Sequence, residues 1–338
     1  MGFIIGAIKV IFLLGFLVFI HEGGHFTVAK LCKVKVREFS IGFGPKIFSK
    51  QGTETKYSIR AIPFGGYVDM LGETEQVKEQ GSFSEAKVWK RMAIVVAGAV
   101  VNIIFALVIY FALMSCSGVN RSTVVKQVMP EYMTEDTVLQ AGDRITSING
   151  EKIRIKSDMS HILQSSNGEN LALQVERNGE KIDLEVTPIS VEYGNVTGYI
   201  LGIEVEQAEK NLTNNIYYGF WETVEFLSAT KDGLIMLLTG NVQLNQMTGP
   251  VGISEMVVQT SGVYDFVYLL AVVSLSLGIT NLLPIPALDG GRMVLLLVEA
   301  IRKKKIAEET ELKIQTLGFT FLILLSLYVS FNDVVRLF

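Results

Sequence analysis

The sequence predicts a polytopic α-helical membrane protein of about four transmembrane helices, with an inserted extracytoplasmic α+β domain and a small membrane-associated β-hairpin. Three observations support this prediction. Hydrophobic residues make up 49% of the 338 residues and the mean hydropathy is +0.38, which is too apolar for an average soluble enzyme. Four apolar stretches each reach the roughly 20 residues that a bilayer crossing needs. The polar segment between the second and third stretches shows strand and turn patterns.

The first apolar stretch is interpreted as a retained span. No basic segment and no small-residue cleavage site precede His21, so the stretch does not resemble a signal peptide. The third stretch breaks at Pro284 and Pro286, and its apolar character resumes at 293–300. The expected spans are 3–31, 92–114, 263–283 and 317–335.

Charged residues in the loops predict the orientation of the chain. Lysine and arginine are frequent in 33–91 and recur in 302–305, whereas acidic residues are frequent in 120–210. Positively charged loops stay in the cytoplasm, so both termini and residues 120–210 are expected on the extracytoplasmic side. The net charge of -4 and the absence of a basic face or tail give no indication of a nucleic-acid partner. Cys32 and Cys116 lie in different apolar runs and predict neither a disulfide framework nor a Cys-x-x-Cys metal pair.

The extracytoplasmic segment is expected to fold from short strands. Asn149-Gly150 and Asn178-Gly179 are typical of two-residue hairpin turns. A short helix is expected at 157–164, and the candidate strands are 122–128, 144–148, 171–177 and 181–186.

Two further elements are expected outside the spans. The loop 33–91 holds a strand pair, 55–61 and 66–71, joined through Pro63 and two glycines, and a glycine-rich loop at 41–45. The stretch 216–238 is apolar on one stripe only, because acidic and basic residues recur along it. It is therefore expected to be an amphipathic helix at the membrane interface rather than a fifth span.

The motif His21-Glu22-Gly23-Gly24-His25 indicates a metal site within the first span. Two histidines four residues apart project from one helix face, so that two imidazole nitrogens reach one zinc ion. Glu22 stands beside that ion and is the candidate general base. An ionisable residue inside a membrane helix costs roughly 2.5 to 3.5 kcal/mol, and a bound metal compensates for it. The alternative is a polar cluster at the membrane edge that pairs with Lys30.

Asp289 is the candidate third metal ligand. It is an acid in an otherwise apolar stretch, next to prolines and glycines that open the backbone. With it, the site keeps a fourth position for water, as catalytic zinc requires, although iron or cobalt would also suit these ligands. The alternative is an ion pair between Asp289 and Arg292. His161 lies in the external domain and is interpreted as a surface or packing residue.

Two asparagines are the other polar side chains within the spans. Asn281 is favoured as a residue that orients the substrate backbone or stabilises an oxyanion. For Asn102 an interhelical hydrogen bond is favoured over a functional role.

These residues together resemble the site-2 protease family of intramembrane zinc metalloproteases, in its bacterial RseP-like branch with one PDZ domain. The resemblance covers nearly the whole chain. It is carried by His21-Glu22-x-Gly24-His25, Asn281-x-x-Pro284-x-Pro286-x-Leu288-Asp289-Gly290, Gly42-Phe43-Gly44, Pro63-Phe64-Gly65-Gly66-Tyr67-Val68, Gly249-Pro250-Val251-Gly252-Ile253 and the PDZ-like Ala141-Gly142-Asp143-x-Ile145-x-x-Ile148-Asn149-Gly150.

The resemblance implies zinc-dependent cleavage of single-span membrane proteins within the lipid bilayer, in regulated intramembrane proteolysis. Substrates would be anti-sigma-factor-like proteins or remnant signal peptides, held by strand addition to the hairpin. The alternative is that the charged edges and Pro63 simply guard an edge strand. The PDZ-like domain would bind peptides or exclude bulky substrates. The implied substrate-binding residues are Asn281, Pro284, Pro286, Gly42, Gly44, Gly65 and Gly66.

The expected division of the chain follows from these assignments. It comprises span one with the zinc motif (1–32), a cytoplasmic-side loop with the β-hairpin (33–91), span two (92–115), the extracytoplasmic PDZ-like domain (120–207), amphipathic and linker helices (212–260), span three with the third zinc ligand (263–300) and span four (315–336). Two other classes of protein fit the sequence less well. A non-catalytic membrane scaffold with a peptide-binding PDZ domain would not need His21, Glu22, His25 and Asp289, and a transporter would show inverted repeats, which the sequence lacks.

Overall fold

The computed structural model describes residues 2–73, 75, 77–117, 121–132, 138–193, 196–239 and 248–336. The chain forms two compact units, one of residues 1–109 and 234–338 and the other of residues 110–233. Helices α2 (Val88–Ser117) and α4 (Leu212–Leu238) pass from one unit into the other. Part of the expected linker, residues 240–247, lies outside the described residues.

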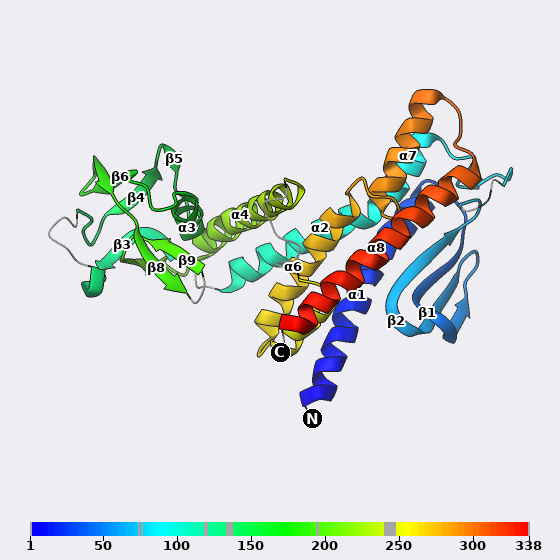
Figure 1. The fold of residues 1–338 in the computed structure, drawn as a ribbon, viewed down its shortest axis with the longest axis horizontal. Helices are drawn as coiled ribbons and strands as arrows, with labels where there is room; N and C mark the ends of the chain where they lie inside the picture. The colour runs from blue at the N-terminus through cyan, green and yellow to red at the C-terminus, as the bar shows by residue number, and fades with distance from the viewer. Residues whose placement is uncertain are drawn as a thin grey trace. The chain divides into compact units, whose positions relative to one another are not determined.

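The first unit is built mainly of helices (Figure 1). Among the described residues, four helices are long and apolar enough to cross a membrane: α1 (Gly2–Leu31), α2, α6 (Val263–Asn281) and α8 (Glu308–Arg336). Leu13 and Leu17 of α1 pack with Leu269 and Leu270 of α6 in a buried cluster. The expectation of a multi-pass membrane protein with about four spans is confirmed.

A short helix, α5 (Pro250–Gln259), is held at both ends by charged side chains from two of these helices. The carboxylate of Asp333 in α8 accepts hydrogen bonds from the backbone N–H groups of Gly249 and Gly252 at the start of α5. The ammonium of Lys9 in α1 donates to the backbone carbonyl of Thr260 at its end, over 2.7 Å. An acid at the helix start and a base at its end both complement the helix dipole. The polar ends of α5 therefore find partners inside an apolar bundle.

The break after α6 gives a separate helix rather than a resumed span. Helix α7 (Asp289–Arg302) begins at Asp289, before the expected point at Met293. The connecting segment folds back over the first turn of α7, so that a Cβ on Gly290 would lie 2.3 Å from the Leu283 carbonyl oxygen. Gly318 of α8 packs against Pro286 in the same way, at 2.3 Å from its carbonyl oxygen. These close backbone approaches fix the start of α7, and with it Asp289.

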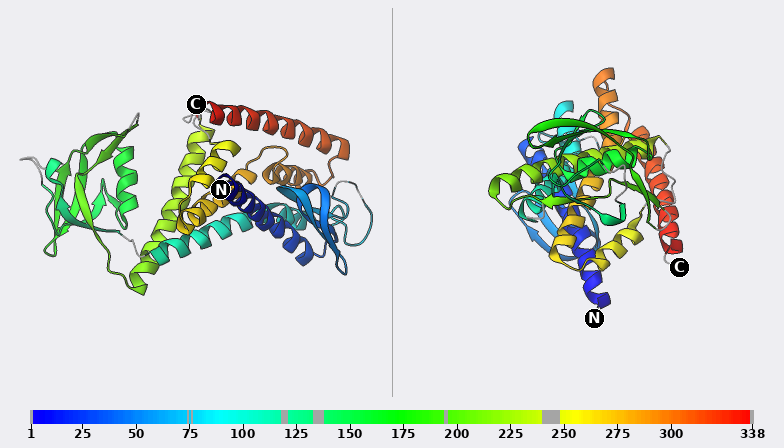
Figure 2. Two further views of the ribbon diagram at one scale, coloured as in Figure 1. Left: turned by 90° about the horizontal axis from the view of Figure 1, so that it is seen from below. Right: turned by 90° about the vertical axis from the view of Figure 1, so that its left-hand side faces the viewer.

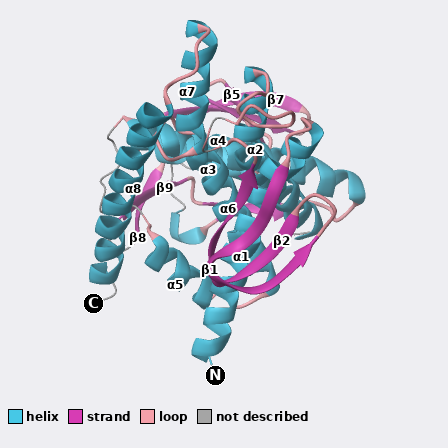
Figure 3. Cartoon of the chain, turned by 90° about the vertical axis from the view of Figure 1, so that its right-hand side faces the viewer, coloured by secondary structure: helices cyan, strands magenta, loops and turns pink. Residues whose placement is uncertain are grey.

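Two long strands, β1 (Val36–Gln51) and β2 (Lys56–Met70), form a curled sheet beside α1 (Figure 3). The first half of β1 lies between the two halves of β2, because Ile41 pairs with both Ile59 and Gly66. The expected pairing of residues 55–61 with 66–71 is therefore wrong: both belong to β2, and each pairs with β1. The 41–45 segment is strand rather than loop, since Gly42 and Gly44 take positive φ angles of 86° and 81° at the register shifts. Figure 2 shows the sheet from two further sides.

The second unit contains an antiparallel sheet with strand order β10-β3-β4-β6-β7, in which β5 pairs with β4. Asn149 and Gly150, with φ of 50° and 81°, join β4 to β5, and Asn178 and Gly179, with φ of 52° and 85°, join β6 to β7. Both dipeptides thus form the two-residue turns that the sequence predicts. The elements are β3 (Arg121–Val128), η1 (Pro130–Tyr132), β4 (Arg144–Ile148), β5 (Glu151–Lys152), α3 (Lys156–Ser165), β6 (Leu171–Arg177), β7 (Glu180–Val186), β8 (Ile189–Tyr193), β9 (Val196–Ile200) and β10 (Ile203–Gln207).

Helix α4 packs its polar side on α3 and leaves apolar side chains exposed. Glu222 accepts a hydrogen bond of 2.9 Å from the Ser157 hydroxyl, and Arg154 lies over the ring of Trp221. Leu212 and Phe220 are among the large apolar side chains left exposed. The expected amphipathic helix is present, and it begins four residues before the predicted start at Ile216.

Candidate metal centre

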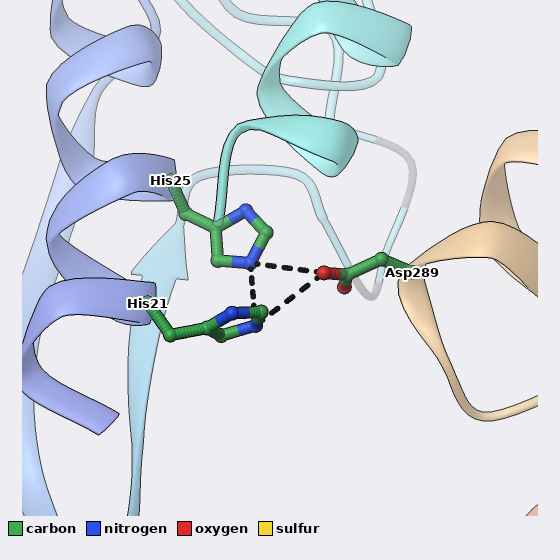
Figure 4. Close-up of side chains that lie close together, drawn as sticks. All are labelled: His21, His25 and Asp289. Carbon is green, nitrogen blue, oxygen red and sulfur yellow. Dashed lines mark hydrogen bonds and ion pairs between the residues drawn. The ribbon is translucent and has the colours of Figure 1, made fainter. Parts of the chain in front are cut away.

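Helix α1 and the start of α7 bring three ligand atoms together (Figure 4). His21 Nε2 and His25 Nε2 lie 3.3 Å apart, because a spacing of four residues places both rings on one helix face. Asp289 Oδ2 lies 3.4 Å from His21 Nε2 and 3.5 Å from His25 Nε2. Among the described residues, these three form the only group of three or more potential metal ligands of this kind.

The spacing of the three atoms fits a zinc ion. Two ligands that each lie about 2.0 Å from a tetrahedral ion are separated by about 3.3 Å. The three separations of 3.3, 3.4 and 3.5 Å lie close to that value. Asp289 Oδ2 is also buried without a hydrogen-bond partner among the described residues, which is costly for a carboxylate unless a cation neutralises it. The donor set of two imidazoles and one carboxylate, with a position left for water, is that of a catalytic zinc site.

Helix α2 contacts the Nδ1 atoms of both histidines, and its Gly98 lies against the rings themselves. His25 Nδ1 lies 2.8 Å from the backbone carbonyl of Ile94, and His21 Nδ1 lies 3.3 Å from the Asn102 amide nitrogen. Gly98 makes room for the rings, since a Cβ there would lie 2.4 Å from His25 Nε2. Sequence reasoning missed the contributions of Ile94 and Gly98, and for Asn102 it favoured an interhelical hydrogen bond over a functional role.

Glu22 opens onto a cavity of about 210 Å³ that the metal-ligand residues also line. The second half of β2 borders the same cavity through Gly66, Tyr67 and Val68. A Cβ on Gly66 would lie 2.8 Å from the Ser40 carbonyl oxygen and 3.1 Å from Glu22 Cγ, so the glycine lets this strand lie close both to β1 and to Glu22. The arrangement places a strand edge, an acid and the metal ligands around one space.

The alternative pairings considered for the site residues are wrong. Lys30 binds Glu54 at 2.7 Å rather than the motif, and Arg292 binds Glu73 at 2.5 Å rather than Asp289. His161 is half exposed, and its Nε2 lies 3.8 Å from Oδ2 of Asp232 within the second unit.

The expected substrate-binding residues differ in whether they line the cavity beside Glu22. Gly66 lines the cavity beside Glu22, whereas Gly42 and Gly44 lie at bends of β1, and Gly65, with φ of 113°, packs against the Phe43 ring. Asn281 is the last residue of α6, and Pro284 and Pro286 lie in the segment that leads to Asp289. Apart from Gly66, none of these expected residues is among those that line the cavity beside Glu22.

A bundle of membrane helices that encloses two histidines, a glutamate and an aspartate in this geometry defines the class of intramembrane metallopeptidases. Residues 9–325 match the model of peptidase family M50, and the chain belongs to this family. The family resemblance drawn from the motifs is thereby confirmed. The chain is a zinc metalloendopeptidase, as predicted, and it is a multi-pass membrane protein.

Individual relatives agree with this assignment. The chain is 32% identical to the regulator of sigma-W protease RasP of Bacillus subtilis, over 99% of this chain and 100% of that protein. It is 30% identical to the zinc metalloprotease RasP of Geobacillus kaustophilus, over 98% of each. Among solved structures, the PDZ domain of an SdrC-like protein from Listeria monocytogenes matches 25% of this chain and 87% of its own, with 16% identity and a TM-score of 0.22.

Proposed function

We propose that this zinc endopeptidase performs site-2 cleavage of single-span membrane proteins at His21, His25 and Asp289, with Glu22 as the general base. The convergence of the three ligand atoms at 3.3 to 3.5 Å is the observation that carries the proposal. When bound, zinc supplies a Lewis acid that polarises the scissile carbonyl and makes a water molecule acidic near neutral pH.

The residues of the chain then have distinct tasks. His21 and His25 would hold zinc through Nε2, and Asp289 would hold it through Oδ2. Glu22 accepts the proton of the attacking water and passes it to the amide nitrogen of the leaving peptide. Glu22 is suited to this task because it follows the first ligand in α1 and faces the same cavity of about 210 Å³.

The edge of β2 is the proposed binding site for an unwound substrate segment. The carbonyl groups of a helical substrate are hydrogen-bonded and shielded, so the peptide must unwind before attack. Residues 66–70 pair with β1 on one side, and within the described residues no strand pairs with their other side. Strand addition there would run the substrate past Glu22, because Gly66 packs against the Glu22 side chain. Asn281, Pro284 and Pro286 are proposed to contact the substrate from the α7 side.

The membrane orientation follows from the loop charges. The basic residues in 33–91 and 302–305 support a cytoplasmic location for these loops, with both termini and residues 121–207 outside. The exposed apolar side of α4 supports its lying at the membrane surface. Residues 121–207 and α4 together form, we propose, a filter that admits substrates already trimmed on their outer side.

The substrate class is proposed from the relatives and from the location of the site. The name of the Bacillus subtilis relative connects that protein with sigma-W regulation, which supports an anti-sigma-factor-like substrate here. Remnant signal peptides share the single apolar span and form the second proposed substrate class. A scaffold role is disfavoured, because a scaffold would not need the four site residues at this spacing.

Purified protein in liposomes with a single-span model substrate tests the proposal. We expect cleavage that a zinc chelator abolishes and that added zinc restores. Glu22→Gln should retain zinc and lose cleavage, by a factor on the order of 10² to 10⁴ for loss of a general base. Glu54→Gln, an exposed acid that binds Lys30, is the matched control and should cleave normally. Cleavage that persists in Glu22→Gln or in chelator would overturn the proposal.

A further inference from the structure

Each imidazole of the metal centre has a second nitrogen, and α2 meets both of them. His25 Nδ1–H donates to the backbone carbonyl of Ile94 over 2.8 Å. A carbonyl oxygen only accepts hydrogen bonds, so this contact keeps the proton on Nδ1. Nε2 of His25 therefore keeps its lone pair for the metal.

His21 depends in the same way on Asn102. The Asn102 amide nitrogen is 3.3 Å from His21 Nδ1, the side chain is fully buried, and its Oδ1 has no hydrogen-bond partner among the described residues. A half-turn of the amide exchanges its oxygen and nitrogen. With the nitrogen toward His21, the amide donates to Nδ1 and the ring proton moves to Nε2, which then cannot bind a metal. With the oxygen toward His21, Nδ1–H donates to the amide and Nε2 is free.

We propose that Asn102 is a positioning residue of the metal centre, whose Oδ1 accepts the Nδ1 proton of His21 and so fixes this ring as an Nε2 ligand. The inference rests on the proposed ligand set. It makes the support of the two histidines equivalent, with one acceptor from α2 for each.

The position and chemistry of Asn102 suit this task. Its own backbone carbonyl accepts a hydrogen bond of 2.9 Å from the hydroxyl of Ser274 in α6, which ties this turn of α2 to a second helix. An amide offers an acceptor without a charge, whereas a carboxylate at the same place would add a second buried acid beside Asp289 inside a membrane helix. The remaining alternative is a hydrogen bond that merely joins two helices.

The zinc affinity of detergent-purified protein, measured by competition with a chelating dye, separates these two roles. Asn102→Leu keeps the branching of the side chain and removes the acceptor, and it should weaken zinc binding roughly 10- to 100-fold, as removal of an outer hydrogen-bond partner does. Asn102→Asp keeps an acceptor and should bind zinc more tightly than Asn102→Leu. Ser274→Ala is the matched control, because it removes a buried interhelical hydrogen bond without touching a histidine, and its zinc affinity should be unchanged.

The thermal midpoint of the metal-free protein shows whether a variant has a folding defect. If Asn102→Leu lowers it more than Ser274→Ala does, Asn102→Ser provides the same test, since its hydroxyl oxygen falls one bond short of the ring. Normal zinc affinity in both Asn102→Leu and Asn102→Ser, together with weakened binding in His21→Ala, would overturn the positioning role and leave the ligand set intact. Normal binding in His21→Ala would instead overturn the ligand set, and the role of Asn102 with it.

Discussion

Gly98 lies so close to His25 that a Cβ atom on the glycine would be 2.4 Å from the ring Nε2. The same Cβ would be 2.8 Å from Cε1 of His21. A side chain on α2 at this position would therefore occupy the space of both imidazoles. The α1–α2 contact is made by small residues, as close helix pairs in membranes commonly are, and the ligand geometry depends on it.

Gly98→Ala should consequently displace both ligands and weaken zinc binding strongly. A misplacement of about 1 Å can cost on the order of 10²-fold in activity, and we expect a loss of at least that size in cleavage. Zinc content after dialysis and the rate of substrate cleavage check this prediction.

Gly23→Ala is the control for this substitution. Gly23 lies within the same motif, but a Cβ there meets no other atom within 4 Å. The variant should therefore bind zinc and cleave normally. Equal behaviour of the two variants would show that Gly98 is not required for the packing of the site.

Asp289 gives a second prediction, which concerns its role and that of its charge in zinc binding. Asp289→Ala should lose most bound zinc, because two histidines alone leave the ion one protein ligand short. Asp289→Asn keeps the shape and the oxygen but loses the charge, and it should bind zinc more weakly than the unmodified protein and better than Asp289→Ala. Metal analysis of the three proteins at equal free zinc is the measurement. Unchanged zinc occupancy in Asp289→Ala would remove Asp289 from the ligand set.

Arg292 and Glu73 give a third prediction. Their ion pair, 2.5 Å long, lines both the cavity beside Glu22 and an adjoining cavity of about 520 Å³. Both side chains are partly shielded from solvent, so removal of one partner leaves a poorly solvated charge. Glu73→Gln and Arg292→Gln should each lower the thermal midpoint, and the double variant should lose less than the two single losses added together. The expected coupling energy is about 1 kcal/mol. Additive losses would mean that the pair contributes nothing.

The local parts of the site could be predicted from the sequence, and the reasons are physical. A helix fixes the relation of His21 to His25 through its own period, so the spacing alone places both rings on one face. Asp289 could be recognised because an acid beside helix breakers is unusual in an apolar stretch. Asn149-Gly150 and Asn178-Gly179 formed the expected turns, because these dipeptides readily adopt positive φ at both positions.

The contributions of other elements could not be predicted in the same way. Helix α2 is apolar on all sides, so its hydropathy has no period that would show that Gly98 and Asn102 face the histidines. The pairing of β1 with both halves of β2 also escaped prediction, since strand patterns predict which residues extend but not which strand they join. In both cases the missing information concerns contacts between segments that are far apart in the chain.

A last prediction concerns the pH dependence of the second unit through Asp143. Its side chain is fully buried, and its carboxylate accepts hydrogen bonds from the Arg177 guanidinium and from the backbone N–H of Gln140. Burial by itself would raise the pKa of Asp143, but the hydrogen bonds and charge of Arg177 outweigh it and hold this pKa below its usual 3.8. Because the folded pKa lies below the unfolded one, the stabilisation is fully present above about pH 3.8 and is lost as the pH falls through the folded value.

Asp143→Asn should therefore destabilise the second unit at neutral pH, by about 2 kcal/mol for the loss of charge-assisted hydrogen bonds to a buried group. The difference between the variant and the unmodified protein should shrink as the pH is lowered below 3.8, because the unmodified Asp143 then becomes neutral as well. Hydrogen exchange of the amides in β4 and β6, measured in the full-length protein at several pH values, reports this stability directly. A difference that stays constant from neutral pH to pH 2 would show that the charge of Asp143 does not stabilise the fold.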